Sequence, residues 1–377
     1  MSAAFPKGRT AFLVIHGIGE QNPFETLDSF GRGLICYLKS VGIDFQLEHR
    51  LADRKKGTEQ EWTESYVRIR FSPDSYIDLH EYYWAYLTEK KITMSEIWQW
   101  VNQTLQGTKR FFRENVDLQK RYEARQKPYW FRLRQVFWML LLLYPWVYLA
   151  LLLTPLWKSL QGFRQWLEKL GPSIIVDYIG DIAIYTTMDQ KSSHYATRQK
   201  ILTESSKLLE EILTAEDYQQ VYLAGHSLGS VIAFDTLNRL NLKSISDANT
   251  AKNTSKLSGL ITFGSPLDKI AFFFREHARP SQYLRRQIMG FLHSFKARPL
   301  SLKPEPFAMT SQVERKLDHL PWVNYYADND PISGHLDFYL GVENCKLQLP
   351  QGWGKAHACY WDYLPFYRNL VQKFTLI

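Results

Sequence analysis

The chain has 377 residues, of which 45% are hydrophobic, 22% charged and 15% aromatic. This composition excludes disordered, collagen-like and low-complexity proteins and predicts a folded chain with a sizeable core. The formal net charge of +8 is concentrated, because residues 109–134 and 158–169 together carry twelve Lys and Arg against four acids. This excess flanks one apolar segment, which favours anionic lipid headgroups over nucleic acid as the partner.

Cysteine usage and the amino terminus indicate the compartment. Cys36, Cys345 and Cys359 are odd in number and match no metal-binding spacing, so we expect free thiols with neither a disulfide framework nor a zinc site. The first ten residues contain no apolar core of the kind found in secretory signals. We therefore expect the folded part of the chain to face the cytosol.

The first elements are predicted from short apolar runs. Residues 10–16 contain a short continuous apolar run and are followed by a glycine, which predicts a strand buried on both faces. Residues 24–40 have the period of an amphipathic helix, and residues 45–49 and 66–71 are typical of strands. Residues 76–86 are mixed and very aromatic, and their pattern predicts no single element.

Residues 89–172 differ in character and predict a helical, basic and Trp-rich insertion. At its centre, residues 136–157 run for 22 residues without a charge, and a helix of this length would span about 33 Å, enough to cross a bilayer. A single crossing would separate strands that should share one sheet, and Pro145 breaks a helix near the middle. We therefore expect a re-entrant or in-plane membrane anchor; an apolar lid and a buried cap helix are the alternatives.

After the insertion, strands again alternate with helices. Residues 189–213 are typical of a helix with a polar face, and residues 283–303 are a basic amphipathic stretch, either lipid-facing or solvated. Further strands are predicted at residues 220–224, 260–263, 322–327 and 345–349. The alternation predicts an α/β fold with a mostly parallel sheet and helices on both faces, formed by residues 1–88 and 173–377 around the insertion.

The pentapeptide Gly-His-Ser-Leu-Gly at residues 225–229 carries the strongest chemical signal. It follows a predicted strand and precedes a good helix, which is the order that a nucleophile elbow requires. A glycine stands two residues before and two residues after the serine, because the tight turn leaves no room for side chains at these two positions. The following helix directs its first N–H groups at the nucleophile, where negative charge develops during acyl transfer. Ser227 is therefore the expected nucleophile.

A serine hydroxyl needs a base and an orienting acid, expected in the chain order Ser, acid, His. Asp330 follows a predicted strand and precedes a proline that forces a turn; Asp328 and Asp268 are the alternatives. Both His335 and His357 lie downstream of Asp330. His335 is only five residues further on, too near for a final strand and its return loop, so His357 is the expected base.

An oxyanion hole needs a second backbone donor from the loop after an early strand. The dipeptide His-Gly at residues 16–17 follows the first apolar run, and its glycine would let the backbone approach a substrate. We therefore expect the amides of Ile18 and Leu228 to hold the oxyanion; a plain glycine turn is the alternative.

The His-Gly dipeptide, the pentapeptide, Asp330 with its proline and His357 together resemble an α/β-hydrolase of the lipase/esterase kind. The Gly-His-Ser-Leu-Gly form is similar to that of many lipases and of GPI inositol-deacylase-like proteins. The resemblance covers about residues 9–86 and 174–377. It implies the α/β-hydrolase fold and hydrolysis of a carboxylic ester.

These residues predict a membrane-associated serine hydrolase at the cytoplasmic face, which cleaves a lipid or other long-chain ester through an acyl-enzyme. Ser227, His357 and Asp330 form the expected triad, residues 136–157 the expected membrane contact, and no metal or cofactor is required. Two alternatives remain open. One is an acyltransferase with the same triad, and the other is a non-catalytic, membrane-tethered binding protein on the same fold.

Overall fold

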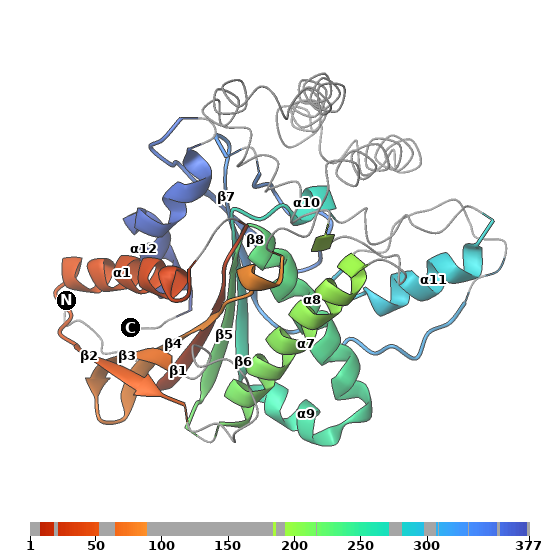
Figure 1. The fold of residues 1–377 in the computed structure, drawn as a ribbon, viewed down its shortest axis with the longest axis horizontal. Coiled ribbons are helices and arrows are strands. Elements are labelled where there is room, and N and C mark those ends of the chain that lie inside the picture. The colour runs from red at the N-terminus through yellow and green to blue at the C-terminus, as the bar shows by residue number, and fades with distance from the viewer. Residues whose placement is uncertain are drawn as a thin grey trace, which may run out of the picture.

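A computed structural model shows one sheet of eight strands with helices on both faces (Figure 1). It describes residues 8–18, 22–52, 65–88, 184–185, 193–215, 217–270, 281–297, 307, 309–330, 332–352 and 355–374. The predicted insertion at residues 89–172, including the apolar residues 136–157, lies outside the described residues and stays a prediction. Among the helices that are described, none combines the length and the apolar character needed to cross a bilayer.

The sheet is mostly parallel, as predicted. Its strands are β1 (Arg9–Ile15), β2 (Gln46–Leu51), β3 (Ser65–Ser72), β4 (Ser75–Tyr82), β5 (Gln220–His226), β6 (Leu257–Phe263), β7 (Trp322–Ala327) and β8 (Val342–Leu347). They lie in the order β2-β3-β4-β1-β5-β6-β7-β8. From β4 to β8 every neighbouring pair is parallel, whereas β2 and β3 run antiparallel at one edge. Strands from both ends of the chain therefore share one sheet.

Two layers of helices cover the sheet (Figure 1). On one face lie α1 (Glu25–Ser40) and α12 (Leu364–Lys373), and on the other α7 (Ser193–Thr214), α8 (Leu228–Ser246) and α9 (Ala248–Asn253). The shorter elements are α10 (Leu267–Ile270), α11 (Tyr283–Leu292) and the 3-10 helices η2 (Ala85–Leu87), η4 (Thr254–Lys256) and η5 (Ala356–Asp362).

The continuous apolar run of β1 is explained by burial on both faces. Alternate side chains of a strand point to opposite faces of its sheet. Leu13 and Ile15 pack in the core beneath α7 and α8, whereas Phe12 and Val14 pack in the core beneath α1 and α12. β1 also lies between β4 and β5, so its carboxyl end reaches the centre of the sheet edge.

The sequence pattern did not reveal β4, although all eight of its residues are buried. Its polar side chains have partners from elsewhere in the chain. Asp78 accepts hydrogen bonds from Arg68 Nε at 2.8 Å and from the Tyr218 hydroxyl at 2.7 Å, and His80 Nε2 lies 3.0 Å from the same hydroxyl. Glu81 accepts hydrogen bonds from backbone amides at the start of α1. Polar side chains whose hydrogen bonds are satisfied can be buried. A buried strand therefore need not have an apolar sequence pattern.

Replacing Arg68 with Leu should lower the free energy of unfolding by about 3–5 kcal/mol, because it leaves the carboxylate of Asp78 buried and without its ionic partner. The Asp78 side chain is 0% exposed. Chemical denaturation measures the loss. The control is Arg32→Leu: Arg32 is 53% exposed and pairs with exposed acids, so we expect a change within about 0.5 kcal/mol. Equal losses of unfolding free energy in the two variants would contradict the role of Arg68 as the stabilising partner of buried Asp78.

Candidate active site

The predicted strand, turn and helix around the pentapeptide are present. β5 ends at His226, α8 begins at Leu228, and Ser227 joins them with φ 51° and ψ −127°. A non-glycine residue at positive φ is strained, and such strain is characteristic of functional sites. Ser227 is only 1% exposed, and its amide donates a hydrogen bond to the carbonyl of Phe263 on β6 at 3.1 Å. The nucleophile candidate therefore stands on a sharp turn at the carboxyl edge of the sheet.

Gly229, two residues after the serine, lets this turn contact the end of β1. A Cβ atom on Gly229 would lie 2.2 Å from the carbonyl oxygen of Ile15 and 2.3 Å from that of His16. No side chain fits at these distances from backbone atoms. Gly229 therefore brings Ser227 next to the turn that follows β1, where the oxyanion donor is expected.

The turn after β1 is held by His16. Trp84 donates its amide N–H to His16 Nε2 at 3.0 Å, so the proton of this ring sits on Nδ1, which donates to the carbonyl of Gly17 at 2.7 Å. In a trans peptide the N–H and C=O groups point in opposite directions. The N–H of Ile18 therefore points away from the His16 ring. A Cβ atom on Gly17 would lie 2.6 Å from the Cβ of Ser227, so this turn contacts the nucleophile candidate.

The second expected oxyanion donor is the amide of Leu228. It is the first residue of α8, directly after Ser227. The first N–H groups of a helix have no partner within the helix and carry the positive end of its dipole. Both predicted donors thus come from segments that contact Ser227.

Burial lowers the pKa of His16 to about 4. The native state therefore stays unprotonated at His16 while the unfolded state binds a proton below pH 6.5, so the stability contribution of His16 is lost as the pH falls from 6.5 towards 4. Between pH 7 and pH 5 this loss amounts to about 2 kcal/mol. We expect the difference in unfolding free energy between these pH values to be smaller by this amount in His16→Gln. Denaturant titrations at both pH values measure it; an unchanged difference would contradict a buried neutral His16.

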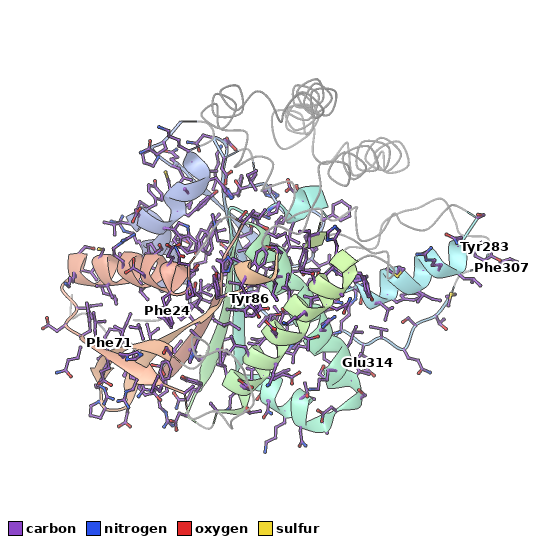
Figure 2. All side chains as sticks on the ribbon, viewed as in Figure 1. Phe24, Phe71, Tyr86, Tyr283, Phe307 and Glu314 are labelled. Carbon is purple, nitrogen blue, oxygen red and sulfur yellow. The ribbon has the colours of Figure 1, made fainter. Side chains whose placement is uncertain are left out.

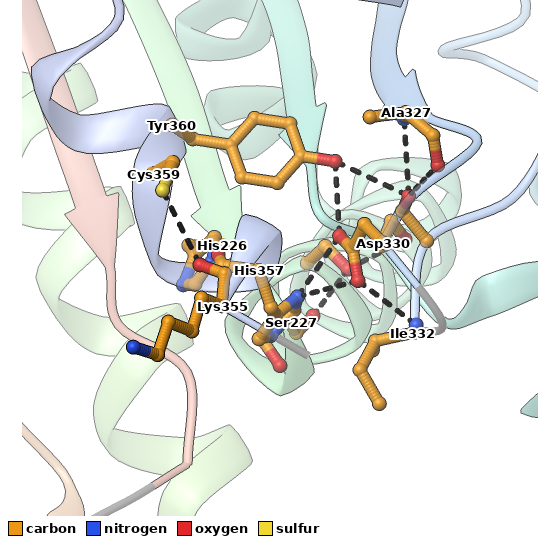
Figure 3. Close-up of polar contacts among 12 residues, drawn as sticks. His226, Ser227, Ala327, Asp330, Ile332, Lys355, His357, Cys359 and Tyr360 are labelled. Atoms are coloured by element: carbon orange, nitrogen blue, oxygen red, sulfur yellow. Dashed lines mark hydrogen bonds and ion pairs between the residues drawn. The ribbon is translucent and has the colours of Figure 1, made fainter. Parts of the chain in front are cut away.

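An Asp–His pair lies at the same edge of the sheet (Figure 3). Asp330 follows β7, and His357 lies on η5. His357 Nδ1 is 3.1 Å from Asp330 Oδ1 and 3.0 Å from Oδ2. Asp330 also accepts hydrogen bonds from the amide of Ile332 at 2.9 Å and from the hydroxyl of Tyr360 at 2.9 Å. The buried carboxylate is therefore surrounded by donors.

Two opposing effects act on the pKa of Asp330. Burial raises it, but the attraction of His357 and the hydrogen bonds from His357, Ile332 and Tyr360 outweigh burial and hold the pKa well below its ordinary value of 3.8. The carboxylate is thus ionised at neutral pH and can only accept hydrogen bonds. It fixes the proton of neutral His357 on Nδ1 and leaves Nε2 as the basic atom.

Ser227 and His357 belong to the same part of the site, because His226, the residue before Ser227, contacts His357. The ring of His226, the residue before Ser227, lies with its centroid 4.7 Å from that of His357. The Oγ atom of Ser227 is buried and makes no hydrogen bond to any residue in the described ranges. Nucleophile–base hydrogen bonds are often long without substrate and tighten in the complex. The Ser227 hydroxyl therefore has no competing partner within the described ranges.

The alternative acids and base have other surroundings. Asp328 is exposed and forms an ion pair with Lys346 on β8. His335 Nδ1 lies 3.0 Å from the carboxylate of Asp337. The buried carboxylate of Asp268 lies against the loop around residue 334. The geometry therefore favours Asp330 and His357 over these alternatives.

Sequence reasoning missed Tyr360. Its hydroxyl donates to Asp330 and lies 3.2 Å from the hydroxyl of Ser333, so it helps to hold the carboxylate that contacts His357. Residues three apart eclipse on a 3-10 helix. The spacing from His357 to Tyr360 was therefore a usable signal, but only once η5 was known to be a 3-10 helix.

The site consists of a strained serine, a hydrogen-bonded His–Asp pair and two backbone amides. Within the described ranges no group of three or more His, Cys, Asp or Glu side chains is placed to hold a metal ion. No protein-family model matches the chain, and no curated protein matches it.

Proposed function

We propose that the protein is a serine hydrolase that cleaves a lipid or other long-chain carboxylic ester at a membrane surface. The observation that carries this proposal is the His357–Asp330 pair, which contacts the residue before a strained Ser227 at a strand–helix turn. A serine, a histidine and a carboxylate in this relation are the groups that acyl transfer requires.

The reaction follows from the hydrogen bonds. Ser227 Oγ attacks the acyl carbonyl while His357 Nε2 takes its proton, and Asp330 stabilises the imidazolium that forms. His357 then gives this proton to the leaving alcohol as the C–O bond breaks, which leaves an acyl-serine. A water molecule repeats the attack with His357 as the base and releases the carboxylic acid. The amides of Ile18 and Leu228 stabilise the oxyanion in both steps.

The positions of these groups in the sheet support an α/β-hydrolase fold. Ser227 follows β5, the oxyanion turn follows the neighbouring β1, Asp330 follows β7, and His357 comes after β8. Strand, elbow and helix occur in the order expected of this fold, and the chain order is Ser, Asp, His. In parallel sheets, ligands bind at the carboxyl ends of the strands.

The membrane part of the proposal is supported by the amino-acid sequence. Residues 136–157 carry no charge, and Lys and Arg predominate on both sides of them. Such a segment is typical of a protein that contacts anionic lipid from the cytoplasmic side. Replacing the four leucines at residues 140–143 with serine should abolish co-sedimentation with phosphatidylserine-containing vesicles. Unchanged binding would remove this role from the segment.

The hydrolase proposal is tested with a fluorophosphonate probe, which loses fluoride as it forms a P–O bond to an activated serine. We expect the label at Ser227 in the peptide identified by mass spectrometry, and no label in Ser227→Ala. The exposed Ser246 on α8 provides the control, since Ser246→Ala should label like the wild type. Because Ser227 is 1% exposed, labelling is measured with and without lipid vesicles. Folded wild-type protein that stays unlabelled in both conditions would overturn the proposal.

A further inference from the structure

The residue before the nucleophile, His226, occupies an aromatic pocket that needs no imidazole for packing. It is 6% exposed, and its ring lies 5.1 Å from Phe263 and 4.9 Å from Trp361, measured between centroids. Contacts between this ring and its aromatic neighbours do not require nitrogen atoms. A buried polar group is expected to make hydrogen bonds, so the ring nitrogens point to the reason for a histidine here.

One ring nitrogen of His226 holds the backbone of the proposed base. His226 Nε2 lies 3.0 Å from the backbone carbonyl oxygen of His357. A carbonyl only accepts hydrogen bonds, so Nε2 carries the proton and donates it. Burial lowers the pKa of His226 to about 3. The ring is therefore neutral at physiological pH, and Nδ1 carries no proton.

The other nitrogen faces the turn that carries the oxyanion donor. A Cβ atom on Gly17 would lie 3.3 Å from His226 Nδ1 and 3.2 Å from the His226 carbonyl oxygen. His226 thus lies between the two segments that must meet at Ser227: the turn after β1 and the 3-10 helix η5.

Resting on the proposed function, we propose that His226 is a positioning residue that sets the place of His357 relative to Ser227. His357 is then held at two points, its carbonyl by His226 and its ring by Asp330. Tyr360 on the same 3-10 helix is also bonded to Asp330, and the bond from His226 fixes the backbone at residue 357 itself. Displacing a catalytic group by about 1 Å can cost about 10²-fold in rate. His226 and Ser227 are adjacent, so one backbone segment carries the nucleophile and the donor that places its base.

The test compares two substitutions at this position. His226→Phe keeps a ring of similar size and removes the donor, whereas His226→Gln places an amide N–H near the position of Nε2. We expect the maximal rate of fluorophosphonate labelling of Ser227 to fall on the order of 10²-fold in the Phe variant. The probe concentration for half-maximal rate should stay within about twofold of the wild type. The Gln variant should be labelled at least about tenfold faster than the Phe variant. Rates are measured with lipid vesicles present.

The matched control is His80→Phe. His80 is also buried, and its Nε2 lies 3.0 Å from the hydroxyl of Tyr218, so this variant removes a comparable bond in another part of the sheet. We expect its labelling rate to match the wild type even if its melting temperature falls. A Phe variant at residue 226 that labels at the wild-type rate would overturn the positioning role. So would a folded Gln variant that is no faster than Phe.

A measurement on the unaltered protein is independent of whether any variant folds. Histidine ¹⁵N NMR should show His226 as a neutral ring protonated on Nε2 between pH 6 and pH 8. Protonation on Nδ1 would overturn the inference. Absence of wild-type labelling would instead contradict the hydrolase proposal, and the two failures are therefore distinguishable.

Discussion

Replacing either Ser227 or His357 with Ala is expected to lower the turnover of a long-chain p-nitrophenyl ester by about 10⁶-fold, and the double variant to be no slower. The reason is that the two groups act as one unit: without the base the hydroxyl is not activated, and without the hydroxyl the base has no proton to take. Residual catalysis of about 10³–10⁴ over water would come from the oxyanion donors and substrate binding.

The control for this pair is His335→Ala. This histidine also lies after β7 but is paired with Asp337, and we expect its turnover to stay within about twofold of the wild type. Losses in the double variant that multiply those of the single variants would show that Ser227 and His357 act separately. That result would contradict the proposed triad.

Replacing Asp330 with Asn should lower turnover by about 10⁴-fold while the fold is kept. The amide of Ile332 and the hydroxyl of Tyr360 both donate towards this side chain. Ile332 donates to Oδ1 and Tyr360 to Oδ2, and His357 Nδ1 lies 3.1 Å from Oδ1 and 3.0 Å from Oδ2. The NH₂ group of an Asn therefore faces His357 at either of the two positions. An N–H opposite Nδ1 forces the proton of His357 onto Nε2, and the ring can then no longer accept the proton of Ser227.

This prediction is checked by turnover between pH 5 and pH 9, with Asp328→Asn as the control. Asp328 is exposed and bound to Lys346, so its variant should stay within about twofold of the wild type. Because the pKa of Asp330 is held below 3.8, the carboxylate is ionised throughout this range, and the deficit of Asp330→Asn should persist at every pH. A deficit confined to high or low pH would contradict the assigned role.

The parts of the site that could be predicted depend on local geometry or chain order. Gly229 indicates the elbow because only a residue without a side chain allows contact with the carbonyls at the end of β1. Asp330 and His357 could be chosen because the edge of a parallel sheet collects the residues that follow its strands. Their hydrogen bond was not visible in the sequence, since it joins residues 27 positions apart.

The parts that could not be predicted depend on distant polar partners. The sequence pattern of β4 predicts no regular element because Asp78 and His80 interrupt its apolar residues. Their burial depends on Tyr218, which is 140 residues from Asp78 and 138 from His80. The role of His226 is hidden for the same reason: its hydrogen-bond acceptor is 131 residues away. A polar residue in a strand carries no sign of a partner that lies so far along the chain.

The pairing of β1 has a consequence for biosynthesis. Residues 10–15 of β1 pair with residues 220–225 of β5, so one side of this strand has no partner until the ribosome has made about 210 more residues. At about 5–20 residues per second, translation leaves that side open for about 10–40 s. An apolar strand with an unpaired edge is prone to wrong pairing with other chains. Newly made protein should therefore depend on chaperones during this interval more than the finished molecule does.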